Sequence, residues 1–294
     1  MRPLHIRILR NVRNPDSLLG WVRYQLSRDN NVHFVTLPSS GTHWLRFMMA
    51  KALVDAYELD YEFTGIRPHD LVPTFRAKDQ RFRYNDRESI PRIQHSHKGY
   101  SVLYRNSRVV LLVRDLRDSM VSSYDTYVGG IDPDMDFSSF LRADGVDERY
   151  HRTLERRVAF LNSWHENSEK LEDLLIVHYE DLKRDTVSEV HSVLEFVGIE
   201  AVTDGLVTDV VEFGSFKNMQ RLEDPAESQP ERGSADEQTD QDEGRKINEG
   251  RSDRWGEYFS NDDIEYFNRH IDENLIYEYG YDYSSFEAST QAGT

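Results

Sequence analysis

Short, mainly apolar segments, each followed by a helical pattern, limit what this 294-residue chain can fold into. The runs at 32–37, 109–113 and 174–177 are typical of strands buried on both faces. Apolar residues at helical spacing follow at 44–57 and 116–127. Strands that alternate with helices in this way predict an α/β fold: a single domain with a central parallel sheet flanked by helices.

The rest of the chain divides into further regular elements and polar segments. We predict a short strand and four more helices, at 93–97, 149–171, 186–197, 203–213 and 261–277. The folded domain then spans 31–283, between an N-terminal arm at 1–30 and a frayed polar tail at 284–294. Residues 223–243 contain many acids and no large apolar residue, which predicts a mobile acidic loop. This loop precedes a basic motif and could act as a lid, although a plain solvated insert has the same composition.

The composition excludes several kinds of protein and site. The chain has no Cys, so it forms no disulfide and no thiolate metal site. No apolar run approaches the about 18 residues of a membrane-spanning helix, and the basic N-terminus lacks the features of a signal peptide. A formal net charge of −17 disfavours nucleic acid as a partner. We therefore expect a cytoplasmic protein without a transmembrane segment.

The basic residues are unevenly divided between the two types. Only seven of the 36 are Lys, and the others are Arg. An acidic, Lys-poor and Arg-rich surface suits a salt-rich cytoplasm, so we hypothesise a halophilic source. An acidic mesophilic protein encoded by a GC-rich genome is the alternative.

The segment at 34–44 has the form of an anion site, because an apolar strand runs through a tight loop into a helix. Such a loop directs backbone N–H groups at one point, where the helix dipole adds positive charge. Gly41 allows a phosphate to approach the backbone, and the hydroxyls of Ser40 and Thr42 can donate hydrogen bonds. The Lys that follows Gly in a Walker A loop is missing, which argues against ordinary NTP hydrolysis.

Two basic segments can complete a site for a phosphorylated ligand. Arg114 ends the apolar run at 109–113, and Ser122 lies eight residues later in the predicted helix. Ligands of parallel sheets bind beyond the carboxyl ends of strands, so Arg114 can reach the loop; a salt bridge with a neighbouring acid is the alternative. Arg245 and Lys246 follow the acidic loop and can clamp a second phosphate, unless they form a solvated charge cluster.

Taken in order, these segments resemble those of the sulfotransferase family that uses 3′-phosphoadenosine-5′-phosphosulfate (PAPS), over about residues 32–260. The family's loop reads close to Tyr-Pro-Lys-Ser-Gly-Thr-Thr-Trp, and this chain has Leu-Pro-Ser-Ser-Gly-Thr-His-Trp. The Arg and Ser eight residues apart, a Tyr-Glu-Asp and a Ser-Phe-x-x-Met also match. An Arg-Lys segment matches loosely, with Ile247 in place of the family Gly. The resemblance implies a P-loop nucleotide-kinase-like core in a cytosolic-type sulfotransferase domain, with PAPS as co-substrate and no metal.

The resemblance also assigns residues to the three parts of PAPS. The expected contacts are Ser39, Ser40, Gly41, Thr42, His43 and Trp44 for the 5′-phosphosulfate, Arg114, Ser122, Arg245 and Lys246 for the 3′-phosphate, and Trp44, Tyr179, Ser215 and Phe216 for the adenine.

The family's catalytic His carries over to a His-rich segment. A family Lys-Thr-His near the end of a short strand aligns with His95, Ser96 and His97. The resemblance therefore makes His97 the general base that deprotonates an acceptor hydroxyl, and a neutral imidazole suits this role because its ordinary pKa is about 6.5. His95 takes the place of the family Lys and is a second catalytic candidate.

This chain departs from the family loop at two positions. Ser39 replaces the Lys that stabilises charge on the leaving phosphate, and His43 replaces the second Thr. We hypothesise that a protonated His43, with Arg46 one turn on, supplies the missing donor. A catalytically silent nucleotide-binding protein and a P-loop kinase or NTPase are the alternatives. The expected acceptor is a small molecule, a glycan or a glycolipid, and a homodimer is compatible with the sequence.

Overall fold

The computed structural model describes residues 31–66, 68–74, 84, 87, 89–146, 150, 152–223 and 253–283. The predicted arm at 1–30, residues 224–243 of the acidic loop, Arg245, Lys246 and the tail at 284–294 lie outside the described residues. Within the described part of the chain, no helix has the length and apolar character that crossing a bilayer requires.

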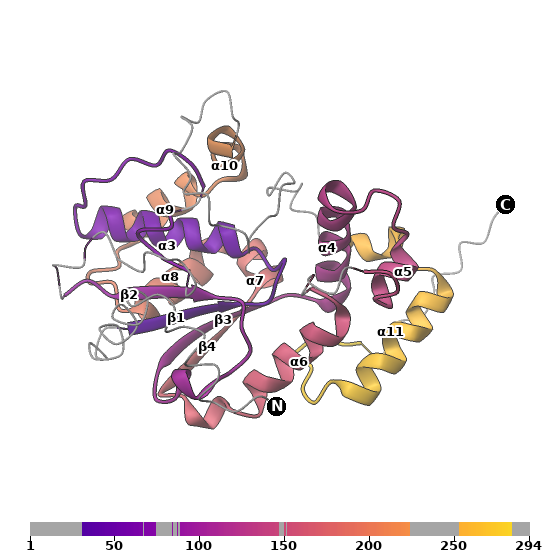
Figure 1. The fold of residues 1–294 in the computed structure, drawn as a ribbon. Coiled ribbons are helices and arrows are strands. Elements are labelled where there is room, and N and C mark those ends of the chain that lie inside the picture. Colours follow the sequence, from indigo (N-terminus) through magenta and orange to yellow (C-terminus); the bar gives the residue numbers. More distant parts are fainter. Residues whose placement is uncertain are drawn as a thin grey trace, which may run out of the picture.

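Four parallel strands form the central sheet, in the order β2-β1-β3-β4 (Figure 1). The strands are β1 (Asn31–Thr36), β2 (Arg92–Ser96), β3 (Arg108–Val113) and β4 (Asp173–His178). Val35 of β1 lies opposite Ser96 of β2 on one side and Leu111 of β3 on the other. Because every pair is parallel, the carboxyl ends of β1, β2 and β3 lie at the same edge of the sheet. The predicted α/β fold is confirmed.

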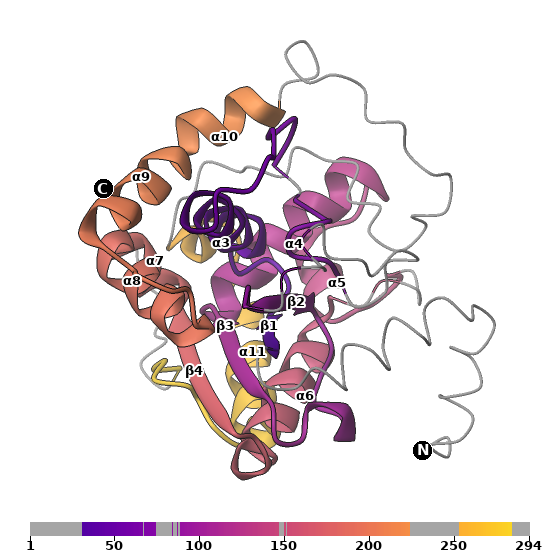
Figure 2. The same cartoon turned by 90° about the vertical axis from the view of Figure 1, so that its left-hand side faces the viewer.

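Helices cover both faces of the sheet (Figures 1 and 2). One layer contains α3 (Thr42–Ala56), α8 (Thr186–Val197) and α9 (Asp204–Phe213), and the other contains α4 (Leu116–Gly130), α6 (Leu154–His165) and α11 (Asn261–Asn274). Phe34 and Val110 point into the first layer, whereas Val35 and Leu111 point into the second. Side chains alternate along a strand, so an apolar run of this kind places apolar groups on both faces.

Two predicted elements differ most from the structure. The helix predicted at 149–171 is shorter, because α6 ends at His165 and only a 3-10 turn, Ser168–Lys170, follows it. The run at 174–177 lies in β4 as predicted, but β4 pairs only with β3 and forms an edge of the sheet. Most of its residues are therefore half-buried, and only Val177 is fully enclosed. The other α-helices of the described residues are the short helices α5 (Phe137–Leu141), α7 (Tyr179–Arg184) and α10 (Phe216–Glu223).

Candidate functional site

The loop after β1 turns sharply into α3. Ser39 and Gly41 both have a left-handed backbone, with φ of 62° and 89°, and Gly41 is the N-cap of α3. Ser40 is buried, and its hydroxyl donates to the Leu37 carbonyl at 2.5 Å. The proton of Ser40 is thus used inside the loop. The first backbone N–H groups of α3 are donors that a helix N-terminus offers to an anion.

The ring of Tyr179, at the start of α7, covers this loop. A Cβ atom on residue 41 would lie 2.7 Å from Cδ2 of Tyr179, so glycine is needed at Gly41 for close approach as well as for its φ. Tyr179 is 7% exposed, and the guanidinium carbon of Arg114 lies 4.5 Å from its ring centre. The loop, the end of β3 and the start of α7 therefore meet at one point.

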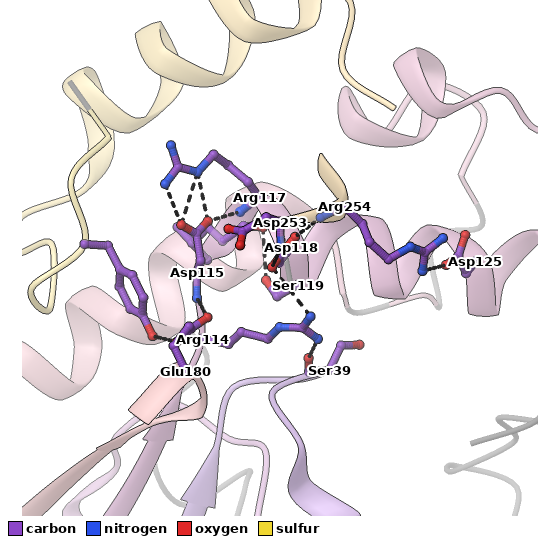
Figure 3. Close-up of polar contacts among 12 residues, drawn as sticks. Ser39, Arg114, Asp115, Arg117, Asp118, Ser119, Asp125, Glu180, Asp253 and Arg254 are labelled. Carbon is purple, nitrogen blue, oxygen red and sulfur yellow. Dashed lines mark hydrogen bonds and ion pairs between the residues drawn. The ribbon is translucent and has the colours of Figure 1, made fainter. Parts of the chain in front are cut away.

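Arg114 follows β3 and points toward the loop (Figure 3). Its Nη1 donates to the Ser39 carbonyl at 3.0 Å, and its Nη2 lies 3.8 Å from a carboxylate oxygen of Asp118. The side chain thus both reaches the loop and contacts a neighbouring acid. Asp118 also accepts hydrogen bonds from the backbone N–H groups of Asp253 at 2.8 Å and Arg254 at 3.1 Å. These bonds tie the chain that follows residue 252 to α4.

The other residues expected at the nucleotide lie around this point and differ in exposure. Ser122 is half-buried on α4, one turn beyond Asp118. Trp44 lies in the first turn of α3, where its Nε1 donates to the Gly214 carbonyl at 2.8 Å and its ring faces Tyr179 edge to face. Ser215 and Phe216 come directly after Gly214 and are both exposed. Trp44 therefore connects Tyr179 to the 214–216 segment.

Two histidines meet at Thr36, the last residue of β1. Nδ1 of His97 lies 3.0 Å from the Thr36 carbonyl oxygen and 2.9 Å from its hydroxyl. A carbonyl oxygen only accepts, so Nδ1 carries the proton and the lone pair of the neutral ring is on Nε2. The same Thr36 hydroxyl lies 3.1 Å from Nε2 of His95 and 2.9 Å from the Thr42 hydroxyl. The end of β1 thus orients the ring of His97.

His95 is buried on β2, with its ring perpendicular to that of His97 at 4.5 Å between ring centres. Burial, reinforced by the positive charge available on His97, Arg46, His43 and His69, lowers the pKa of His95 well below its ordinary value. The ring is therefore neutral near neutral pH. Unlike the family Lys with which it aligns, His95 carries no positive charge there.

The two residues hypothesised to replace the loop lysine lie near the start of α3. His43 is half-buried in the first turn of α3, close enough to influence the pKa of His95. Arg46 is buried; its Nε donates to the Val72 carbonyl at 2.8 Å, and its Nη2 lies 3.2 Å from Nδ1 of His69. Arg46 therefore holds the 68–74 segment against α3.

A second arginine, absent from the sequence-based expectations, reaches the loop from α6. Arg157 is 1% exposed, and its Nη1 donates to the Pro38 carbonyl at 2.6 Å. Its guanidinium also donates to the hydroxyls of Ser119 and Ser123 on α4. Oγ of Ser123 lies in turn 2.8 Å from Oγ of Ser39. Burial lowers the pKa of Arg157 to about 9, so the side chain is still protonated at neutral pH.

The sequence does contain a signal for Arg157. Leu154, Val158 and Leu161 form the apolar stripe of α6, and all three are buried. Arg157 lies three residues after Leu154 and one before Val158, which places it on the same stripe. An arginine on a buried stripe must find polar partners inside the protein, and here the loop after β1 supplies one of them.

The site combines a tight loop at a helix N-terminus with a histidine that follows the neighbouring strand. The N-terminus of α3, Arg114 and Arg157 bring positive charge to the loop, and His97 lies at the end of β2 beside it. Among the described residues, no group of three or more His, Asp or Glu side chains is arranged to hold a metal ion. The geometry is suited to binding a phosphorylated ligand and removing a proton beside it.

Comparisons with known proteins point to one family. The family model described as "Sulfotransferase domain" matches residues 29–277. Flavonol 4′-sulfotransferase of Flaveria chlorifolia is 27% identical over 67% of this chain, and the match spans just under two thirds of that relative, 65% of its length. Flavonol 3-sulfotransferase of Flaveria bidentis is 25% identical over 84% of this chain and 82% of the relative. The crystal structure of mouse sulfotransferase SULT7A1 complexed with PAP is similar in fold, with a TM-score of 0.54 and 20% identity over 88% of this chain and 89% of that one.

Proposed function

This chain belongs to the sulfotransferase family, and we propose that it transfers the sulfuryl group of PAPS to a hydroxyl of a small-molecule acceptor. The acceptor oxygen attacks sulfur in line with the bond to the leaving phosphate oxygen. As the new S–O bond forms, the old one breaks, and 3′-phosphoadenosine-5′-phosphate (PAP) leaves with the bonding electron pair. The acceptor's hydroxyl proton passes to Nε2 of His97.

The orientation of His97 is the observation that carries this proposal. Its Nδ1 is directed at the Thr36 carbonyl at 3.0 Å, which leaves the lone pair on Nε2. A general base needs this tautomer, and positioned bases of this kind contribute about 10² to 10⁴ in rate. Val35 and Ser96 pair in adjacent strands, so the loop after β1 and the base after β2 emerge side by side.

We assign the nucleotide to the residues around the loop. The loop and the N-terminus of α3 take the 5′-phosphosulfate. Arg114 and Ser122, with Arg245 and Lys246 from the segment outside the described residues, take the 3′-phosphate. Trp44, Tyr179 and the 215–216 segment take the adenine, which is supported by the contacts that join Trp44 to Tyr179 and Gly214. We assign no metal to this reaction, because the arginines and backbone N–H groups can neutralise the charge.

Transfer of labelled sulfate tests the proposal. The full chain is incubated with ³⁵S-labelled PAPS and a panel of acceptors: a flavonol, suggested by the names of two relatives, a simple phenol, an oligosaccharide and a glycolipid. We expect transfer to at least one, and loss of at least 10²-fold in kcat for His97→Ala with unchanged affinity for PAP. His191→Ala on α8 is the matched control. Turnover retained by His97→Ala would contradict the assignment of the base.

A catalytically silent nucleotide-binding protein is the second candidate, and Ser39 in place of the family's loop lysine is the observation that favours it. Such a protein binds PAP but transfers no label to any acceptor. A kinase or NTPase would instead hydrolyse or transfer phosphate from ATP in a metal-dependent reaction. The same purified chain, assayed with PAPS and with ATP, separates the three. We also propose a cytoplasmic location, which cell fractionation tests.

A further inference from the structure

We propose that Arg157, acting through Ser123 and Ser39, supplies the donor and the positive charge that a loop lysine supplies in the family pattern. The inference rests on the proposed function, because the ligand of this donor is the 5′-group of PAPS. Arg157 acts as a positioning residue in this scheme. Of the three residues, Ser39 is the one that contacts the ligand.

The contacts of Arg157 show that its guanidinium serves the loop. Nη1 donates to the Pro38 carbonyl at 2.6 Å and to the Ser119 hydroxyl at 3.2 Å, and Nε donates to the Arg152 carbonyl at 3.1 Å. Nη2 donates to the Ser123 hydroxyl. All four partners are neutral oxygens. Within the described part of the chain, the charge of Arg157 is therefore not neutralised by a carboxylate.

Two hydrogen bonds connect Arg157 to Ser39, and the direction of the first is fixed by the guanidinium. A guanidinium only donates, so the Ser123 oxygen accepts from Arg157. Ser123 has one hydroxyl proton, and its neighbour at 2.8 Å is the Ser39 oxygen. Either hydroxyl can be the donor in this second bond. In the proposed arrangement Ser123 donates to Ser39, and the proton of Ser39 is then available to an acceptor outside this chain of bonds. Each donor in the series is polarised by the cation behind it.

The positive charges around the loop also favour an anionic ligand. A second cation, Arg114, donates to the Ser39 carbonyl, so two arginines bind the consecutive carbonyls of Pro38 and Ser39. Burial is the main cause that lowers the pKa of Arg157, and the nearby charges of Arg152 and Arg114 add to it. A buried cation without a counter-ion is unfavourable, and a bound 5′-phosphate group would relieve this.

The same arrangement suits the leaving group of the proposed reaction. As the S–O bond breaks, negative charge develops on the 5′-phosphate oxygen that becomes part of PAP. A Ser39 proton directed at that oxygen stabilises it, and no proton needs to be transferred. PAP carries this charge in full, so its affinity reports the same interaction in a stable complex.

The experiment compares PAP with adenosine 3′-phosphate, which lacks the 5′-group. We expect Ser39→Ala, Ser123→Ala and Arg157→Met each to weaken PAP binding and lower kcat about tenfold to a hundredfold. Affinity for adenosine 3′-phosphate should stay within about twofold, because these residues face the 5′-group only. Arg156→Met is the matched control, since Arg156 is the exposed neighbour of Arg157 on α6 and should behave as the unaltered protein.

A double variant and a rescue variant distinguish the series Arg157–Ser123–Ser39, called the relay below, from a purely structural role of these residues. If Ser123 acts through Ser39, the double variant Ser39→Ala/Ser123→Ala should lose no more than either single variant. Ser39→Lys, which restores the family residue, should recover most of the PAP affinity and kcat in the Arg157→Met background. Additive losses, or no recovery by Ser39→Lys, would overturn the proposal.

Three further outcomes can be interpreted separately. If Arg157→Met does not fold, as judged by its unfolding transition, the Ser39 and Ser123 variants decide alone, since they remove one oxygen each. If the unaltered protein transfers no sulfate but its PAP affinity depends on Arg157, the proposed function fails and the relay stands as an anion site. If Ser39→Ala and Ser123→Ala keep normal kcat and PAP affinity while His43→Ala loses kcat, His43 supplies the donor and the relay is wrong.

Discussion

Replacement of Gly41 by alanine should disrupt the loop after β1. Among the glycines near the site, we expect the largest effect on this loop at Gly41. The backbone of Gly41 has φ of 89°, where an L-residue is strained by about 1–2 kcal/mol. The new Cβ would lie 2.7 Å from Cδ2 and 2.8 Å from Cε2 of Tyr179. Both atoms belong to a rigid ring, so the ring itself must move.

Movement of Tyr179 is opposed by its surroundings. Tyr179 is 7% exposed, and the guanidinium carbon of Arg114 lies 4.5 Å from the centre of its ring. Overpacking of a buried site costs about 1–3 kcal/mol, so with the strain we expect Gly41→Ala to lower the free energy of unfolding by about 2–5 kcal/mol. The total free energy of unfolding of a native protein is about 5–15 kcal/mol. The loss should therefore be large enough to measure and small enough to leave a folded protein.

Urea unfolding and calorimetric PAP binding measure the two consequences. We expect a lower unfolding midpoint and weaker PAP binding, since Tyr179 and the loop both belong to the proposed nucleotide site. Gly129→Ala on α4 is the matched control, because nothing lies within 4 Å of its added Cβ. A Gly41→Ala protein with the stability and PAP affinity of the unaltered chain would refute the argument from close approach.

Three other perturbations have defined outcomes. Burial lowers the pKa of His33 to about 3, so between pH 6.5 and about pH 5 the unfolded chain takes up a proton that the folded chain does not. The free energy of unfolding should therefore fall by about 2 kcal/mol from this group as the pH falls, and His33→Gln should remove that part of the fall in urea titrations at the two pH values. An unchanged pH dependence would contradict this. Asp118→Asn replaces a carboxylate that accepts from the N–H groups of Asp253 and Arg254, and we expect a loss of about 1–3 kcal/mol on thermal or urea unfolding. Asp134→Asn, at an exposed position, should cause none, and equal effects would rule out the tether. A halophilic source predicts that folding and turnover both decline when molar salt is removed; full function in dilute buffer would exclude it.

The predicted elements agree with the structure wherever the pattern is local. The run at 32–37 corresponds to β1, and the helical spacing at 186–197 corresponds to α8, because each pattern repeats within its own segment. The helix predicted at 149–171 extends too far, since the polar residues after His165 continue the spacing weakly and the chain must turn back into β4. Burial of β4 was overestimated for a different reason. An apolar run does not reveal whether its strand is central or at an edge.

The candidate site divides in a similar way. Its loop, its Arg114 and its His97 could be proposed from motifs, because the family resemblance depends on residues close together in the chain. The hydrogen-bond partners and the charge of each side chain could not be predicted from motifs. Ser40 was expected to donate to the ligand, but its proton goes to the Leu37 carbonyl. His95 replaces a family Lys, yet burial keeps it neutral.

The sequence by itself determined the α/β class, the tight loop between β1 and α3, and the absence of a lysine from that loop. These features depend on apolar periodicity and on glycine at a turn, which neighbouring residues decide. Only the tertiary structure brought Arg157 to Pro38, across 119 positions of the chain, and His97 to Thr36, across 61. Such contacts form because α6 packs on the sheet and β2 pairs with β1. The sequence around one residue of each contact does not indicate which residue it will meet. The charge beneath the loop and the orientation of the His97 ring are therefore properties of the packed fold.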